Sequence, residues 1–137
     1  MFKTISYQEK ILKNPGSCRY REDGKNVYFV FSHGAIAVPK SECMLDLTKL
    51  EKTEANIPSY FEIPEKYIPL ESTGFMRRLD TMTVEQFSFG TTVYWLNSRL
   101  LTPFRKDYEY IASGELVLMR NIISGDVDAV MIKVAIK

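Results

Sequence analysis

Three closely spaced prolines constrain this chain more than any other feature. The pair Ile-Pro occurs three times between residues 57 and 69, which places prolines at positions 58, 64 and 69. A proline has no backbone donor, and it favours an extended conformation for the residue before it. This spacing excludes a helix of useful length and a central strand. The residues between the prolines are too apolar for a solvated linker. We therefore expect residues 57–70 to form an extended strap over a hydrophobic surface.

Patterns typical of β-strands lie on both sides of this strap. Asp23-Gly24 separates two β-prone runs, and Asp-Gly is a strong signal for a hairpin turn because both central turn positions need a positive φ. Residues 115–122 fit a helix and a strand equally well. Further strands are predicted at residues 35–38, 83–90, 91–96 and 129–136.

Two short segments have helical signals. Ser6 and Glu9 have the spacing of a capping box, which predicts a helix over about residues 6–13. A second helix is predicted from Ser41 to Leu50, where the apolar residues form an imperfect helical stripe. Both helices are too short to form a bundle.

These elements together predict an α+β fold, in which one or two short helices pack on one face of a twisted antiparallel β-sheet. A length of 137 residues fits one domain, so residues 1–137 are interpreted as a single domain. Within it, the strap at residues 57–70 joins an N-terminal part, made of the helix and the hairpin, to a C-terminal β-rich part.

Charge and cysteine content restrict the compartment and the partners. The net charge is +1, so the sequence encodes no bulk attraction to nucleic acid or to a membrane. No apolar run approaches the 18 or so residues that a membrane span needs. Cys18 and Cys43 are far apart, and the N-terminus does not resemble a secretory signal. We therefore expect a cytoplasmic protein that does not associate with membranes.

The residues most often used in catalysis are sparse. His33 is the only histidine, and nothing in its spacing connects it to either cysteine, so it is interpreted as a turn residue rather than a base. Asp126 and Asp128, with Glu115 or Asp107, would be oxygen ligands for Mg²⁺ or Ca²⁺ if they came together. Solvated acids beside a turn are the favoured interpretation. The glycines form no phosphate-binding motif. We predict no catalytic residue, metal or cofactor.

Arginine and aromatic residues occur together in the C-terminal half. Such mixtures bind single-stranded nucleic acid, because cations track the phosphates and aromatic rings stack on the bases. Asp107 and Glu109 lie in the same stretch and would repel phosphate, and aromatic residues in strands usually belong to the core. The candidate binding residues, for nucleic acid or for a protein partner, are Arg77, Arg78, Tyr94, Trp95, Arg99, Arg105, Lys106 and Tyr108.

The sequence favours a non-catalytic binding or assembly module over an enzyme. Residues for common nucleophilic, zinc or phosphate chemistry are missing, whereas an apolar strap can cover a neighbouring subunit as well as its own core. We expect a homo-oligomer, most simply a dimer, with another protein as a further possible partner. The alternative is a nucleic-acid-binding accessory protein that uses the arginine and aromatic residues. An enzyme that acts through carboxylates alone ranks last.

Overall fold

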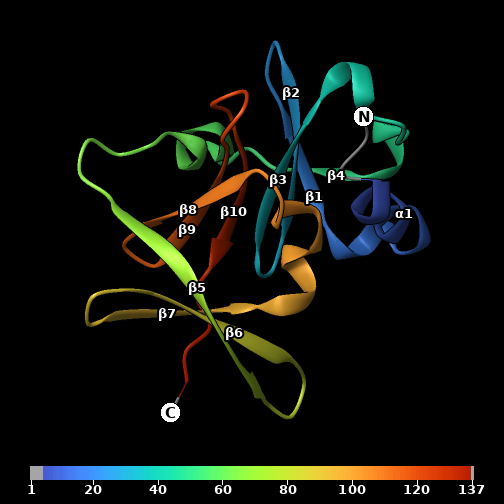
Figure 1. Cartoon of the computed structure of the whole chain (residues 1–137). Helices are drawn as coiled ribbons and strands as arrows, with labels where there is room; N and C mark the ends of the chain where they lie inside the picture. Colours follow the sequence, from blue (N-terminus) through green and yellow to red (C-terminus); the bar gives the residue numbers. More distant parts are fainter. Residues whose placement is uncertain (1–4, 137) are drawn as a thin grey trace. The chain divides into compact units, whose positions relative to one another are not determined.

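A computed structural model describes residues 5–136 of the chain. The chain divides into two compact units, Met1–Glu62 and Ile63–Lys137 (Figure 1). In the described residues, both units are built mainly from antiparallel β-strands. The predicted α+β fold is confirmed.

The first unit contains a small sheet with the strand order β4–β1–β2–β3. β1 pairs with β2 and β2 pairs with β3 in antiparallel fashion, whereas β4 pairs with β1 in parallel. The strands are β1 (Arg19–Glu22), β2 (Asn26–Phe31), β3 (Gly34–Pro39) and β4 (Glu51–Lys52).

The predicted hairpin between β1 and β2 is confirmed, but its turn differs from the expected type, because neither Asp23 nor Gly24 has a positive φ. The Oδ1 atom of Asp23 accepts hydrogen bonds from the backbone N–H groups of Asn26 and Lys25, at 2.7 and 2.8 Å. The Tyr28 hydroxyl donates to Oδ2 at 2.9 Å. These bonds favour the ionised carboxylate, and they lower the pKa of Asp23 with the Asn26 bond as the largest cause. Asp23 therefore holds the turn through its side chain as well as its backbone.

The N-terminal helix is also confirmed, as α1 (Ile5–Lys13). Its Tyr7 ring lies 5.7 Å from the ring of Phe31 on β2. The buried side chain of Gln8 donates to the backbone oxygen of Glu42 and accepts from the backbone N–H of Met44. The amide of Gln8 thus fixes the backbone of the following loop.

The second predicted helix, from Ser41 to Leu50, is wrong. This stretch forms two separate 3-10 turns, Lys40–Glu42 and Leu47–Lys49. The Asp46 carboxylate accepts from the backbone N–H of Thr48 and starts the second turn. Local side-chain bonds of this kind compete with a continuous helix, and the imperfect apolar stripe does not outweigh them. α1 is accordingly the only α-helix in residues 5–136.

The Ile-Pro segment is extended in only part of its length. Ile57–Phe61 forms a 3-10 helix with Pro58 in its first turn, where a missing backbone donor costs nothing. The Phe61 ring packs against Tyr28 at 4.9 Å. The expectation of an extended strap is therefore wrong for the first Ile-Pro pair. The third pair opens a strand.

The second unit contains six strands in the described residues, with the order β10–β9–β8–β5–β6–β7 and antiparallel pairing throughout. The segment at residues 115–122, for which helix and strand had remained open, forms a strand. The strands are β5 (Ile68–Arg78), β6 (Thr83–Phe89), β7 (Thr92–Asn97), β8 (Tyr108–Ser113), β9 (Leu116–Asn121) and β10 (Val127–Ile132).

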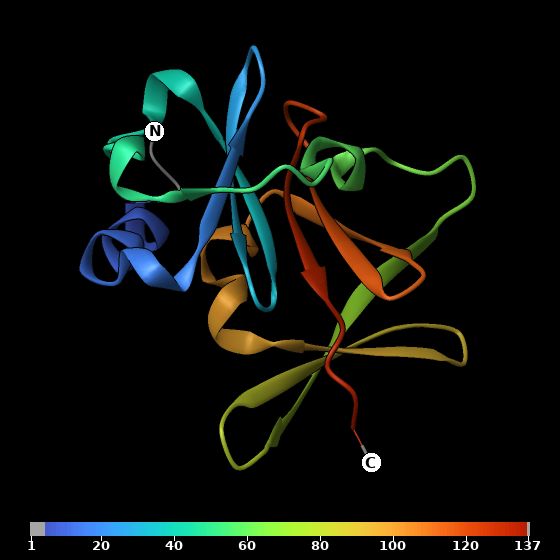
Figure 2. The ribbon, with the colours of Figure 1, turned by 180° about the vertical axis from the view of Figure 1, so that it is seen from behind.

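The long strand β5 changes partner along its length. Its first residues, Ile68 to Leu70, pair with β8, and the rest pairs with β6. Pro69 lies in the part that pairs with β8, next to the beginning of the strand, where a proline is tolerated. β6, β7 and residues 71–78 of β5 form a three-stranded ribbon that extends beyond β8–β10 (Figure 2). We call this element the ribbon.

Aromatic packing attaches the ribbon to the core of the second unit. Phe87 on β6 is fully buried, and its ring lies 4.6 Å from the ring of Tyr110 on β8. The Tyr110 hydroxyl donates to the backbone oxygen of Phe104 at 2.6 Å. Burial raises the pKa of Tyr110, so this hydroxyl stays protonated and remains a donor.

In the described part of the chain, no helix is long and apolar enough to cross a membrane.

Candidate functional site

The register of the ribbon assigns its side chains to two faces. Residues that pair directly across neighbouring strands lie on the same face, and successive residues alternate between faces. One face is largely buried and includes Glu85, Phe87, Tyr94 and Leu96. The other, which we call the outer face, carries Glu71, Thr73, Phe75 and Arg77 from β5, Val84, Gln86 and Ser88 from β6, and Val93, Trp95 and Asn97 from β7. Within this face, Val84, the partner of Arg77, is fully buried.

A β-bulge in β5 shapes the outer face. Ser72 pairs with Phe87 and Met76 with Glu85, so three residues of β5 lie opposite a single residue of β6. Gly74, in the middle of the bulge, has φ of +78°, which glycine adopts without strain. Because the bulge contains three residues, the residues on either side of it keep the same alternation. The face pattern therefore continues along the whole of β5.

Side-chain hydrogen bonds hold the bulge. The Thr73 hydroxyl donates to Oε1 of Gln86 at 3.0 Å and accepts from the backbone N–H of Phe75 at 3.1 Å. On the opposite face, the Ser72 hydroxyl donates to Oε2 of Glu85 at 2.5 Å and accepts from the backbone N–H of Gly74. The bulge is therefore an ordered element that fixes the direction of Phe75.

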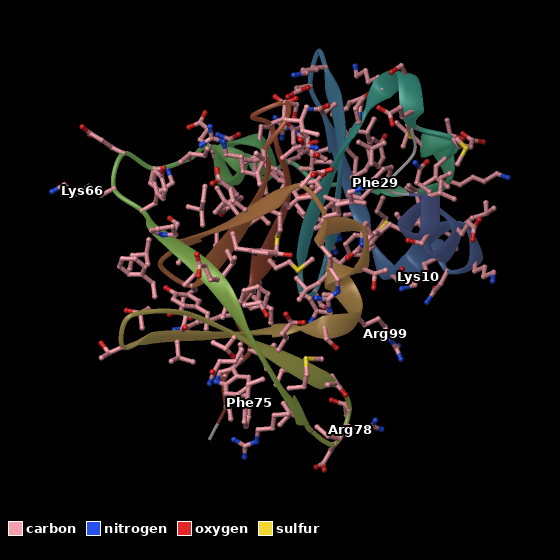
Figure 3. The ribbon with its side chains drawn as sticks, viewed as in Figure 1. Lys10, Phe29, Lys66, Phe75, Arg78 and Arg99 are labelled. Atoms are coloured by element: carbon pink, nitrogen blue, oxygen red, sulfur yellow. The ribbon has the colours of Figure 1, made fainter. Side chains whose placement is uncertain are left out.

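The centre of the outer face is apolar and accessible. The Phe75 ring meets the Trp95 ring edge to face, with 6.2 Å between the centroids. Phe75 is 59% exposed and Val93 is 45% exposed, while Trp95 is half-buried. Phe75 points away from β8–β10 (Figure 3). The segment after β10 runs beside β7, where the backbone N–H of Val134 donates to Trp95 O at 2.8 Å. Aromatic side chains exposed together on an ordered sheet are typical of contact surfaces.

Opposite charges lie at the two ends of this apolar centre. Glu71 and Arg77 both belong to the outer face, and both are exposed. They are six residues apart on β5, but the bulge places them opposite Ser88 and Val84 of β6, which are four residues apart, or roughly 13 Å along a strand. In the part of the chain that the structure describes, neither side chain forms a salt bridge. Both charges are thus available to a partner.

The buried face of the ribbon contains an internal ion pair. Glu85 is buried, with 5% of its surface exposed. The Oε1 atom of its carboxylate lies 2.9 Å from Nη1 of Arg105. With the bond from Ser72, both carboxylate oxygens have partners. This arrangement connects the bulge in β5, strand β6 and the 3-10 segment Ser98–Phe104 that ends just before Arg105. Its role is structural.

The structure does not bring the eight candidate binding residues together. Tyr94 and Tyr108 are buried, and their hydroxyls donate to Gly114 O and to the Asp128 carboxylate. Arg105 forms a salt bridge with Glu85. Lys106 is exposed, but it lies outside the ribbon. Trp95 and Arg77 share the outer face, whereas Arg78 and Arg99 line a pocket at the end of the ribbon.

The other candidate chemical groups are dispersed. His33 is exposed in the turn between β2 and β3, Cys18 is buried and Cys43 is half-buried. Glu115 pairs with Lys133, and Asp128 accepts from Tyr108. Within residues 5–136, no group of three or more His, Cys, Asp or Glu side chains is placed to hold a metal ion.

Comparisons with models of protein families, with curated proteins and with solved structures all found no match. Any functional conclusion must therefore come from the geometry of the site itself.

Phe75, Val93 and Glu71 were not among the residues predicted from the sequence. Phe75 and Glu71 were missed because no strand was predicted over residues 71–78. For Tyr94 and Trp95, the sequence did contain a signal: they are consecutive residues of a predicted strand, so their side chains must point to opposite faces of the sheet. Only one of these two rings was therefore available to an exposed surface.

Proposed function

We propose that the protein is a non-catalytic assembly module that forms a homodimer through the outer face of the ribbon. The observation that carries the proposal is the exposed Phe75 ring, held edge to face against Trp95 by an ordered bulge. An exposed ring that packs against a half-buried one on an ordered sheet loses little conformational entropy on binding and adds apolar area to an interface.

The charges of the outer face favour a second copy of the chain as the partner. A two-fold axis that lies in the plane of the interface and runs across the strands would place Glu71 of one copy opposite Arg77 of the other. The same operation would bring the two Phe75–Trp95 pairs together at the centre. One self-complementary surface thus has an apolar centre and two symmetry-related Glu–Arg contacts at its rim.

The size of the outer face predicts a modest affinity. Three strands that are each about 20 Å long and 4.8 Å apart present an area on the order of 300–500 Å². A standard interface buries about 800 Å² per partner, so the dimer is expected to dissociate in the micromolar range. Dilute solutions would then contain monomer.

A charge exchange tests the two-fold arrangement. Glu71→Arg or Arg77→Glu alone would place like charges opposite each other twice per dimer, and each variant is expected to weaken dimerisation about tenfold or more at low salt. An equimolar mixture of the two variants restores both Glu–Arg contacts in a heterodimer. Sedimentation equilibrium of each variant and of the mixture measures this.

The double variant Glu71→Arg/Arg77→Glu is the matched control, because it keeps the net charge and restores opposite charges across the axis. It is expected to dimerise like the natural chain. If the mixture dimerises no better than the separate variants, then Glu71 does not face Arg77, and the two-fold arrangement is refuted.

A further inference from the structure

A polar pocket lies at one end of the ribbon, where two chain reversals meet. Arg78 is the last residue of β5, and the backbone N–H of Leu79 donates to Met82 O at 2.7 Å to close the turn into β6. Asn97 ends β7, and its side chain accepts from the backbone N–H of Arg99. The pocket has a volume of about 250 Å³ and is lined mainly by Arg78, Thr81, Thr83, Asn97, Ser98 and Arg99.

The lining has a strong bias toward positive charge and hydrogen-bond donors. It contains two guanidinium groups and three hydroxyls but no carboxylate. Arg78 and Arg99 lie at the same end of the ribbon (Figure 3). Asp80 lies in the adjoining turn, but it is exposed and does not line the pocket.

The arginines of this pocket differ from most arginines of the chain. Arg19, Arg105 and Arg120 form salt bridges, and Arg21 donates to the backbone oxygens of Glu54 and Ala55. Within the residues that the structure describes, the side chains of Arg78 and Arg99 have no such partner. Both arginines are exposed, and because they line one pocket without a partner among residues 5–136, both guanidinium groups are available to a bound anion.

We propose that this pocket binds the phosphate group of a small phosphate monoester. A monoester carries a charge of about −1.5 to −2 at pH 7. Two guanidinium forks match that charge, and each can bind phosphate oxygens in a bidentate manner. The volume equals that of about eight liquid waters, which leaves room for a small organic substituent beside the phosphate. The site lies at the end of the ribbon and does not depend on dimerisation.

The test is a titration of the full chain with phenyl phosphate, followed by amide chemical shifts in ¹H–¹⁵N spectra at constant ionic strength. Saturable shifts are expected at Thr83, Ser98 and Arg99. Arg78→Gln and Arg99→Gln should each weaken binding about tenfold or more, because each removes one guanidinium fork. Arg99→Lys keeps the charge but loses the fork, so it should have an intermediate affinity.

Lys106→Gln is the matched control, since it removes one positive charge from an exposed residue that lies outside the ribbon. It should change the affinity less than twofold. Equal weakening by Lys106→Gln and Arg78→Gln would show a diffuse field instead of a site and would overturn the proposal, as would the absence of saturable shifts. The last measurement is the same titration with a single-stranded oligonucleotide that has no terminal phosphates. Tighter binding of that oligonucleotide at the same amides would also refute a monoester site.

Discussion

Replacement of Phe87 by alanine is expected to lower the free energy of unfolding by about 3–5 kcal/mol. Phe87 has 0% exposure and packs its ring against Tyr110. Its removal would leave a cavity at the place where the ribbon joins β8, and buried rings that lose a neighbour lose contact energy as well as transfer free energy. Urea denaturation followed by the fluorescence of Trp95, the single tryptophan, measures the change.

Phe89→Ala is the control for this prediction. Phe89 lies two residues further along β6 on the same face, but it is 56% exposed. Its truncation should cost less than about 1 kcal/mol, because most of its surface is already in water. If both variants lose the same stability, the burial of Phe87 does not attach the ribbon.

Replacement of Arg105 by methionine is expected to cost about 2–4 kcal/mol, which is the second-largest effect. The change would leave the Glu85 carboxylate buried with Ser72 as a donor but without its countercharge. Because the Arg105 side chain is 45% exposed, water can partly replace it, and the cost should lie below that of a fully buried pair. Arg120→Met breaks the exposed pair with Glu109 and should cost less than about 1 kcal/mol.

A double-mutant cycle separates the pair from its surroundings. In Glu85→Gln/Arg105→Met, the amide replaces the carboxylate and no buried charge remains, so the double variant should be more stable than Arg105→Met alone. A double variant with the sum of the two single losses would contradict this account, because it would show no coupling between Glu85 and Arg105.

Local signals were sufficient for much of the fold. The hairpin between β1 and β2, the N-terminal helix and the strands β6 and β7 were each predicted from a few residues, and each was confirmed. The capping box was not confirmed, because Ser6 lies inside α1. β5 was not predicted as a strand: residues 57–70 were expected to form a strap, and the stretch from Glu71 to Gly74 is polar and contains a glycine. Pairing with β6 and the hydrogen bonds of the bulge make this stretch a strand, and both are tertiary effects.

The candidate site was less accessible to sequence reasoning. Adjacency in sequence grouped Tyr94, Trp95, Arg105 and Tyr108, but strand alternation and an internal ion pair separate them in the fold. Arg77 and Trp95 come together only because β5 and β7 lie on either side of β6. Such neighbours depend on strand order, which a single sequence does not specify.

Sedimentation equilibrium of Phe75→Ser beside Phe89→Ser tests the proposed dimer surface most directly. The two rings are similarly exposed, at 59% and 56%, and they lie on opposite faces of the ribbon. The natural chain and Phe89→Ser should change from monomer to dimer over the micromolar range. Phe75→Ser should remain a monomer over the same range, because it removes the aromatic centre of the interface. A natural chain that stays monomeric at high micromolar concentration, or equal dimerisation by all three proteins, would contradict the outer face as the site of self-association.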